Sequence, residues 1–182
     1  MYQELPFADR FVAARDCGFT AVEILSPYQY DIREVSDWLV QSGLEAILIN
    51  IPTGEAGEAG TAAVPGRQAF FQSSFQQALN YATGIGAPMI HVLAGRASEE
   101  VPLSEDLFVD NLRWAADLAA AKGIQLLLEP LNTQDVPGYL HTRTDHTAEL
   151  IHTLNRENIK MQFDFYHMQI MEGNLAAGLK RH

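Results

Sequence analysis

Two spacings of apolar residues alternate along the chain. Segments with apolar side chains three or four positions apart predict helices. Short runs of consecutive apolar residues that end at Gly, Pro or a polar residue predict buried strands. The predicted helices cover residues 6–16, 31–42, 67–85, 104–122, 145–155 and 174 to the end, and the predicted strands cover residues 20–25, 44–50, 89–93, 124–129 and 159–163. Helices and strands therefore alternate throughout the sequence.

This alternation predicts one α/β domain over residues 1–182, with a parallel sheet and right-handed crossovers. A doubly wound sheet and a TIM (β/α)8-type barrel both fit the pattern. No Gly-rich phosphate turn follows the first strand, and acidic residues stand at the ends of later strands, which favours the barrel. A closed barrel has eight strands. Because five are predicted here, we expect an incomplete barrel of about five strand-helix units.

The apolar run at residues 124–132 ends in a carboxylate, Glu129, and a second acid, Asp164, follows the strand predicted at residues 159–163, with His167 three residues further on. Carboxyl ends of parallel strands meet at the ligand-binding edge of a sheet, so the three side chains are expected to converge on one cation. Mg²⁺ and Mn²⁺ prefer carboxylate oxygens, and Mn²⁺ also accepts imidazole. Taken singly, Glu129 could be a solvated acid, Asp164 a helix cap and His167 a hydrogen-bonded structural residue.

Four further residues are candidates for substrate binding. Arg67 follows the loop predicted at residues 51–66, Arg96 lies in the turn after the strand predicted at residues 89–93, and a second loop is predicted at residues 133–142 of the same edge. A guanidinium matches a carboxylate in two places. His91 and Asn50, at the ends of their strands, could bond substrate oxygens. Either arginine could instead be a solvated or cap-binding side chain, and His91 and Asn50 could be core polar groups bonded to backbone. The first loop is long for a compact domain, so we expect it to cover a substrate.

The amino-acid composition argues against some classes of binding partner. The 182 residues carry a formal net charge of −11, which argues against nucleic acid or an anionic membrane as a partner, while small anionic substrates remain compatible. Cys17 is the single cysteine, so no disulfide framework or thiolate metal site is expected and a reducing cytoplasm fits. Cys17 itself is expected to be a small buried group. No apolar run has membrane-spanning length, and no signal-peptide pattern precedes the first helix.

Seven short motifs then resemble, in order, the hydroxypyruvate isomerase group of the xylose-isomerase-like TIM-barrel families. They are Glu4-Leu5-Pro6-Phe7, Ala21-Val22-Glu23, Pro65-Gly66-Arg67, His91-Val92-Leu93-Ala94-Gly95-Arg96, Glu129-Pro130-Leu131-Asn132, Pro137-Gly138-Tyr139 and Gln162-Phe163-Asp164-Phe165-Tyr166-His167. The resemblance runs the full length of the chain. It implies a cytoplasmic isomerase, dependent on a divalent metal ion, that interconverts hydroxypyruvate and tartronate semialdehyde, which are small hydroxy-oxo acids.

The resemblance also implies roles for individual positions. Glu129 corresponds to a glutamate that is both metal ligand and proton-transfer group, Asp164 to a second metal ligand, and His167 to a histidine near the substrate oxygens. It further implies that the first barrel strand precedes Met1, and that the last two strands, with another metal ligand and the second catalytic glutamate, follow His182. Within the chain, Glu23 is the one other strand-end acid that could serve as a second carboxylate, and we do not favour it.

Three alternatives stay open. The substrate could be a 2-oxo-tetronate, as in a close relative of the same family. The chain could be a truncated, non-catalytic fragment, whose two exposed strand edges would promote homo-oligomers. An endonuclease of the same barrel class, acting on abasic DNA, would need more metal-binding histidines and a basic face, whereas this chain has six His and a net charge of −11.

Overall fold

The computed structural model describes residues 1–98 and 100–181. Its strands are β1 (Ala21–Ile24), β2 (Glu45–Asn50), β3 (Met89–His91), β4 (Gln125–Leu128) and β5 (Ile159–Met161). Its helices are α1 (Phe7–Asp16), α2 (Ile32–Ser42), α3 (Gln68–Ile85), α4 (Glu105–Ala120), α5 (Thr144–Leu154), α6 (Phe165–Met171) and α7 (Leu175–Arg181). The five predicted strands and six predicted helices are all present, and α6 is additional.

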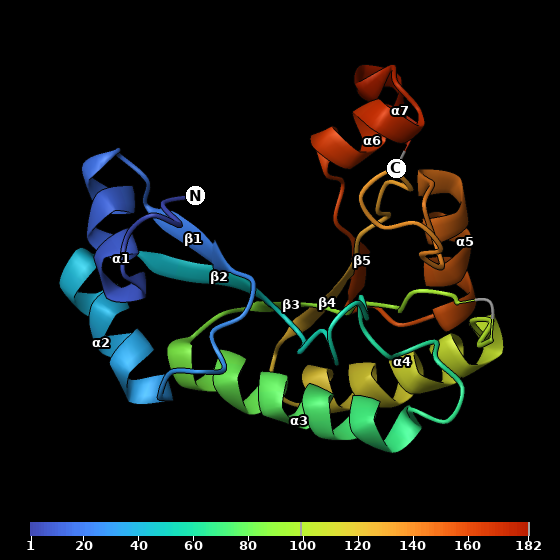
Figure 1. Ribbon diagram of the computed structural model, residues 1–182, viewed down its shortest axis with the longest axis horizontal. Coiled ribbons are helices and arrows are strands. Elements are labelled where there is room, and N and C mark those ends of the chain that lie inside the picture. The colour runs from blue at the N-terminus through green and yellow to red at the C-terminus, as the bar shows by residue number, and fades with distance from the viewer. Residues whose placement is uncertain (99, 182) are drawn as a thin grey trace.

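The strands form one parallel sheet in the order β1-β2-β3-β4-β5, so each strand pairs with the next along the chain. The sheet curves, and α1 to α5 lie along its outer side, whereas α6 and α7 stand beyond the end of β5 (Figure 1). This confirms the prediction of about five strand-helix units of a TIM-type barrel. The carboxyl ends of all five strands share one edge, which therefore collects the residues that follow them.

The core lies between the sheet and the two long helices α3 and α4. Phe71 and Phe75 of α3 and Phe108 of α4 are fully buried, as are the sheet residues Ile90 and Leu126. Burying each such side chain contributes about 1.5–3 kcal/mol. The spacing of four residues between the α3 phenylalanines places both rings on the helix face that is turned to the sheet.

Local signals fix most helix ends within one or two residues of the prediction. Asp31 caps α2 by accepting a hydrogen bond from the Arg33 N–H, and Glu34 completes a capping box. Gly43 ends this helix in the left-handed conformation, at φ +68°. Ser104 caps α4 by accepting from the Leu107 N–H. These helix boundaries depend on side chains that are visible in the sequence.

Two details of the prediction are wrong. The strand expected at residues 159–163 ends at Met161, and a short unpredicted helix, α6, begins at Phe165. Asp164 starts it by accepting hydrogen bonds from the backbone N–H groups of Tyr166 and His167. Cys17 was expected to be buried but is exposed, at the C-cap position directly after α1.

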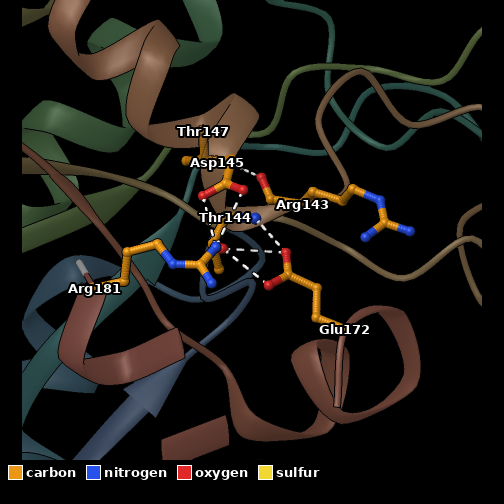
Figure 2. A network of polar contacts seen from close by, with 6 residues as sticks. All are labelled: Arg143, Thr144, Asp145, Thr147, Glu172 and Arg181. Atoms are coloured by element: carbon orange, nitrogen blue, oxygen red, sulfur yellow. Dashed lines mark hydrogen bonds and ion pairs between the residues drawn. The ribbon is translucent and has the colours of Figure 1, made fainter. Parts of the chain in front are cut away.

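Helix α6 is held against α5 by a polar network (Figure 2). The Glu172 carboxylate, directly after α6, accepts from the backbone N–H of Thr144 at 2.7 Å and from its hydroxyl at 3.0 and 3.1 Å. An exposed ion pair between Arg181 of α7 and Asp145 lies beside it. Thr144 is the first residue of α5 and is fully buried. Glu172 therefore caps a neighbouring helix and, in doing so, fixes the orientation of α6.

The long loop at residues 51–66 is tied to the segment after β3. Gly60 forms an isolated antiparallel bridge with Ala94, and a Cβ atom on Gly60 would lie 2.1 Å from the Leu93 carbonyl oxygen. With φ at +94°, Gly60 is a position that favours glycine. A second bridge joins Arg96 to Tyr139 in the loop at residues 133–142. Both predicted loops thus meet at the carboxyl edge of the sheet.

Candidate functional site

Three of the predicted residues come together at the carboxyl edge. Glu129 directly follows β4, Asp164 precedes α6, and His167 lies in the first turn of α6. One potential ligand atom from each lies within 4.8 Å of the other two, and they form the group that could hold a metal ion among the described residues. Glu129 is 7% exposed. The sequence therefore identified the residues that converge, although Asp164 reaches the group from a helix start instead of a strand end.

Glu129 sits in an environment that opposes its negative charge. Burial, the nearby charges of Asp164 and Glu23, and a hydrogen bond to Asp164 raise the pKa of Glu129 to about 8. Two carboxyl groups this close share a proton readily, because both cannot be ionised without repulsion. A divalent cation between them would remove that repulsion. The pair therefore suits either proton transfer or cation binding.

Asp164 caps a helix and also belongs to the group of possible metal ligands. Its Oδ1 accepts hydrogen bonds from the N–H groups of Tyr166 at 2.6 Å and His167 at 3.3 Å, so it caps α6. The positive end of a helix favours a negative charge there. This geometry is thus compatible with Asp164 as a helix cap and also with Asp164 as a candidate metal ligand.

His91 is buried behind Glu129. Its Nδ1 lies 3.4 Å from Glu129 Oε2, and the residue is 2% exposed. Burial and the proximity of His167 lower the pKa of His91 to about 3, so the imidazole is neutral at physiological pH. Its Nε2 is buried without a hydrogen-bond partner among the described residues. A polar bound molecule could satisfy that nitrogen.

Asn50 pairs with His91 across β2 and β3. Its Oδ1 is buried without a partner in the described part of the chain, whereas its carbonyl oxygen accepts a hydrogen bond from the Tyr28 hydroxyl. Gln162, just after β5, also has a buried side-chain oxygen without a described partner. Unsatisfied polar atoms thus occur at the ends of three strands of the sheet, where a ligand could supply the missing hydrogen bonds.

The two candidate arginines differ in their surroundings. Arg67 pairs with Glu58 at 2.9 Å and with Glu55 at 3.2 Å, and its guanidinium lies over the Phe70 ring. The exposed Arg96 donates through Nε to the Pro137 carbonyl oxygen at 2.8 Å. The charge of Arg67 is therefore balanced within its own loop, and Arg96 has the guanidinium with the fewer acidic neighbours of the two.

Glu23 belongs to the electrostatic surroundings of the site. The pKa of Glu23 is raised by burial and by the Asp164 charge, and Glu23 in turn raises the pKa of Glu129. A register shift in the pairing of β1 with β2 falls between Val22 and Glu23. Such irregularities redirect side chains next to active sites. The sequence indicated Glu23 through its apolar neighbours, but not that its charge reaches both other acids.

Sequence reasoning did not assign roles to two buried residues near the site. The Tyr139 hydroxyl accepts a hydrogen bond from the Ala94 N–H, and burial raises the pKa of Tyr139. His141 Nδ1 lies 3.0 Å from the Thr147 hydroxyl, and burial, with His91 nearby, lowers the pKa of His141 to about 3. Tyr139 belongs to one of the seven motifs, whereas nothing in the sequence around His141 marks it as buried.

Among the described helices, none is long and apolar enough to cross a membrane.

Parallel strands with acids gathered at their carboxyl ends are typical of TIM-barrel enzymes. The chain belongs to the xylose isomerase-like TIM barrel family, whose model matches residues 11–181. It is 44% identical over 185 residues to 2-oxo-tetronate isomerase of Cupriavidus necator, covering 100% of this chain and 71% of that protein. It is 40% identical over 183 residues to hydroxypyruvate isomerase of Escherichia coli, covering 97% of this chain and 70% of that protein.

Solved structures agree with the fold. A structure described as AP endonuclease, family 2, from Brucella melitensis superimposes with a TM-score of 0.94 at 37% identity, covering 100% of this chain and 71% of that one. D-psicose 3-epimerase from Clostridium cellulolyticum H10 superimposes with a TM-score of 0.79 at 17% identity, covering 97% and 64%. The second similarity concerns the fold alone.

Proposed function

We propose that this chain is an isomerase that interconverts hydroxypyruvate and tartronate semialdehyde through an enediolate. The observation that carries the proposal is the buried Glu129, which has ligand atoms of Asp164 and His167 within 4.8 Å. The names of the relatives, hydroxypyruvate isomerase and 2-oxo-tetronate isomerase, support the same reaction class. The match of these relatives over 97–100% of the chain favours the enzyme over a non-catalytic fragment.

Glu129 is the proposed proton-transfer group. Isomerisation needs a base that removes a proton from the hydroxymethyl carbon and an acid that returns a proton to the neighbouring carbon, while the hydroxyl proton moves to the former carbonyl oxygen. A carboxyl group whose pKa is about 8 exchanges protons near neutral pH. No redox cofactor is required, because the oxidation of one carbon balances the reduction of its neighbour.

The residues present fit a divalent cation, Mg²⁺ or Mn²⁺, with Glu129 and Asp164 as proposed ligands. The fit rests on two close carboxyl groups, of which Glu129 has its pKa raised by burial and then by the charge of Asp164. Hard cations prefer such oxygens. When bound, the cation would stabilise negative charge that develops on the substrate oxygens. It would also keep Glu129 in the ionised form that a base requires.

The remaining candidates are proposed to hold the substrate. The unpartnered Asn50 Oδ1 and His91 Nε2 would bond its hydroxyl and carbonyl groups, and His167 would bond a reacting oxygen. Arg96 is preferred over Arg67 for the substrate carboxylate, since Arg67 already pairs with two acids. The second catalytic carboxylate is not assigned within this chain. We further propose a cytoplasmic role in glyoxylate metabolism.

A 2-oxo-tetronate is the second candidate substrate, favoured by the 44% identity to the Cupriavidus necator enzyme. The two substrates differ in chain length and share the hydroxy-oxo acid group. Comparing kcat/KM for hydroxypyruvate and for a 2-oxo-tetronate decides between them, since a preference of one over the other appears directly in that ratio.

The endonuclease alternative is supported by the similarity to the Brucella melitensis structure, which is described as AP endonuclease, family 2. The net charge of −11 opposes it, because phosphate backbones are bound through Lys and Arg. Salt-sensitive binding to duplex DNA with an abasic site would favour the nuclease.

We also propose that the two edge strands of the sheet, β1 and β5, support the formation of homo-oligomers. Sizing chromatography tests this proposal.

The decisive experiment is an assay of Glu129→Gln with both substrates and added Mn²⁺. Removing a general base typically costs about 10²–10⁴-fold in rate, so kcat should fall by at least about 10²-fold. Glu149→Gln, on the exposed face of α5, is the matched control and should retain full activity. Full activity in the Glu129→Gln variant would refute the proposal.

A further inference from the structure

The side-chain amide of Asn132 has a single orientation. Its Oδ1 accepts hydrogen bonds from the backbone N–H groups of Gln134 at 3.0 Å and Asp135 at 2.9 Å. Asn132 is 0% exposed, so water does not compete for these groups. A rotated amide would present its NH₂ group to two N–H donors, which is unfavourable. The oxygen therefore points to the loop, and the Nδ2 group points the other way.

On that other side, Nδ2 lies 2.8 Å from His167 Nδ1 and donates to Asp135 Oδ2 at 2.9 Å. The backbone N–H of Asn132 also donates to His167 Nδ1, at 3.1 Å. Two N–H groups thus point at one ring nitrogen. A ring nitrogen that accepts hydrogen bonds carries no proton, so the neutral imidazole must carry its proton on Nε2.

We propose that Asn132 is a positioning residue that fixes His167 in the Nε2–H tautomer, so that His167 donates a hydrogen bond to a substrate oxygen and does not ligate a metal ion. A metal ligand needs a free lone pair. Nδ1 uses its lone pair to accept from Asn132, and Nε2 is protonated. The substrate half of this inference rests on the proposed function, whereas the tautomer follows from the hydrogen bonds alone.

Tyr166 closes the network and agrees with this orientation of the amide. Its hydroxyl donates to Asp135 Oδ2 at 2.8 Å, the same oxygen that accepts from Asn132 Nδ2. Hydrogen bonds from Asn132 and Tyr166 lower the pKa of Asp135, which is therefore an ionised acceptor. An ionised Asp135 requires the NH₂ side of Asn132 to face it. The loop after β4 and the first turn of α6 are thus locked together around the His167 ring.

Two consequences follow for the chemistry. Of the three residues that converge, Glu129 and Asp164 are left as the cation ligands. His167 Nε2–H becomes a fixed donor that can meet the negative charge developing on the enediolate oxygen. Preorganised donors of this kind are typically worth about 10²–10³-fold in rate. Asn132 would thus contribute to catalysis without touching the substrate.

The first test is two-dimensional ¹H–¹⁵N spectroscopy of the metal-free full chain with ¹⁵N-labelled histidine. The His167 signals are identified by their loss in His167→Gln. We expect one protonated nitrogen, Nε2, and one unprotonated nitrogen, Nδ1. A spectrum with the proton on Nδ1, or averaged between the nitrogens, would overturn the inference. This readout needs no substrate, so it is independent of whether the isomerase activity exists.

Asn132→Asp changes the group next to His167 Nδ1 from a donor to an acceptor at nearly constant volume. We expect the single Nε2–H tautomer to be lost in this variant. Tyr166→Phe is the matched control, because it alters the same network without touching the His167 nitrogens, and the native tautomer should persist. An unchanged tautomer in Asn132→Asp would show that the side chain of Asn132 does not fix it.

Manganese titration tests the second half of the inference without depending on the Asn132 variant. If His167 is not a ligand, His167→Gln should bind Mn²⁺ with nearly the native affinity. A loss of more than about 100-fold, beyond the about 10–100-fold expected for partners outside the coordination sphere, would overturn it. Native metal affinity with the Nε2–H tautomer but no isomerase activity would refute the proposed function and leave the tautomer inference standing.

Discussion

The segments that follow β4 and β5 place the same chemical group in opposite surroundings. Glu129 comes directly after β4, is 7% exposed and has its pKa raised to about 8. Asp164 lies three residues beyond the end of β5, is half-buried and accepts two N–H groups at the start of α6. One carboxyl group therefore tends to hold a proton, whereas the other is held where a negative charge is favoured. The two carboxyl groups of one cluster therefore owe their different surroundings to the backbone segments that carry them.

The largest expected effect separates the helix cap that Asp164 forms from its proposed role as a metal ligand. Asparagine caps a helix about as well as aspartate, so Asp164→Asn should keep the stability of the metal-free protein near the native value. Its affinity for Mn²⁺ should fall by more than about 100-fold, because even changes outside the coordination sphere cost about 10–100-fold. Calorimetric titration measures the affinity. Asp164→Ala should lose the same affinity and, in addition, about 1 kcal/mol of stability through the missing cap.

Native affinity in Asp164→Asn would mean that Asp164 is a cap only, and the contrast between the two segments would then have no bearing on metal binding.

The next effect concerns Glu129 and pH. Its folded pKa of about 8 lies above the ordinary value of 4.5, so the folded state retains a proton that the unfolded state has released. The stability of the metal-free protein should therefore fall as pH rises from about 4.5 to 8. A shift of this size corresponds to on the order of 5 kcal/mol. Glu129→Gln has no such proton to lose and should be the more stable protein at pH 8.5.

Urea unfolding of both proteins without metal, at pH 5 and pH 8.5, measures this difference. The native chain and Glu129→Gln should differ little at pH 5. An equal gap at both pH values would show that burial does not shift the ionisation of Glu129.

The smallest effect lies at the far end of α6. Glu172→Ala removes the acceptor of the buried Thr144 N–H, and we expect a loss of about 1 kcal/mol in the free energy of unfolding. The matched control, Arg181→Ala, breaks the exposed pair with Asp145 in the same network and should cost about 0.5 kcal/mol or less. Equal losses in both variants would mean that Glu172 acts only as a surface charge.

The sequence predicted the β4 segment better than the β5 segment, for physical reasons. An apolar run that ends in Glu129 is compatible with few structures, because its apolar residues must be buried and its charged end must reach the edge of the sheet. The residues after β5 allow both a longer strand and a capped helix, because Phe163 and Phe165 suit either. Asp164 decides in favour of the helix through hydrogen bonds to N–H groups two and three residues ahead. The convergence of the site was predictable, whereas this change of element was not.

The hydrogen-bond partners inside the site could not be predicted at all. The contacts of His167 with Asn132 and of His91 with Glu129 join residues 35 and 38 positions apart, and only the folded sheet sets their distances. Arg67 shows the same limit, since nothing in its local pattern indicated that Glu55 and Glu58 would neutralise it. Motifs indicated the candidate residues, and tertiary packing decided what each one bonds.

The strand order has a consequence for synthesis on the ribosome. Because each strand pairs with its predecessor in the chain, every new strand-helix unit can dock on units that have already emerged, without waiting for distant segments. The carboxylate after β4 would thus be in place before the segment that carries its partner leaves the exit tunnel. We expect a released chain that ends soon after α5 to be largely folded yet unable to hold the proposed cation, so that assembly of the centre is among the last events of folding.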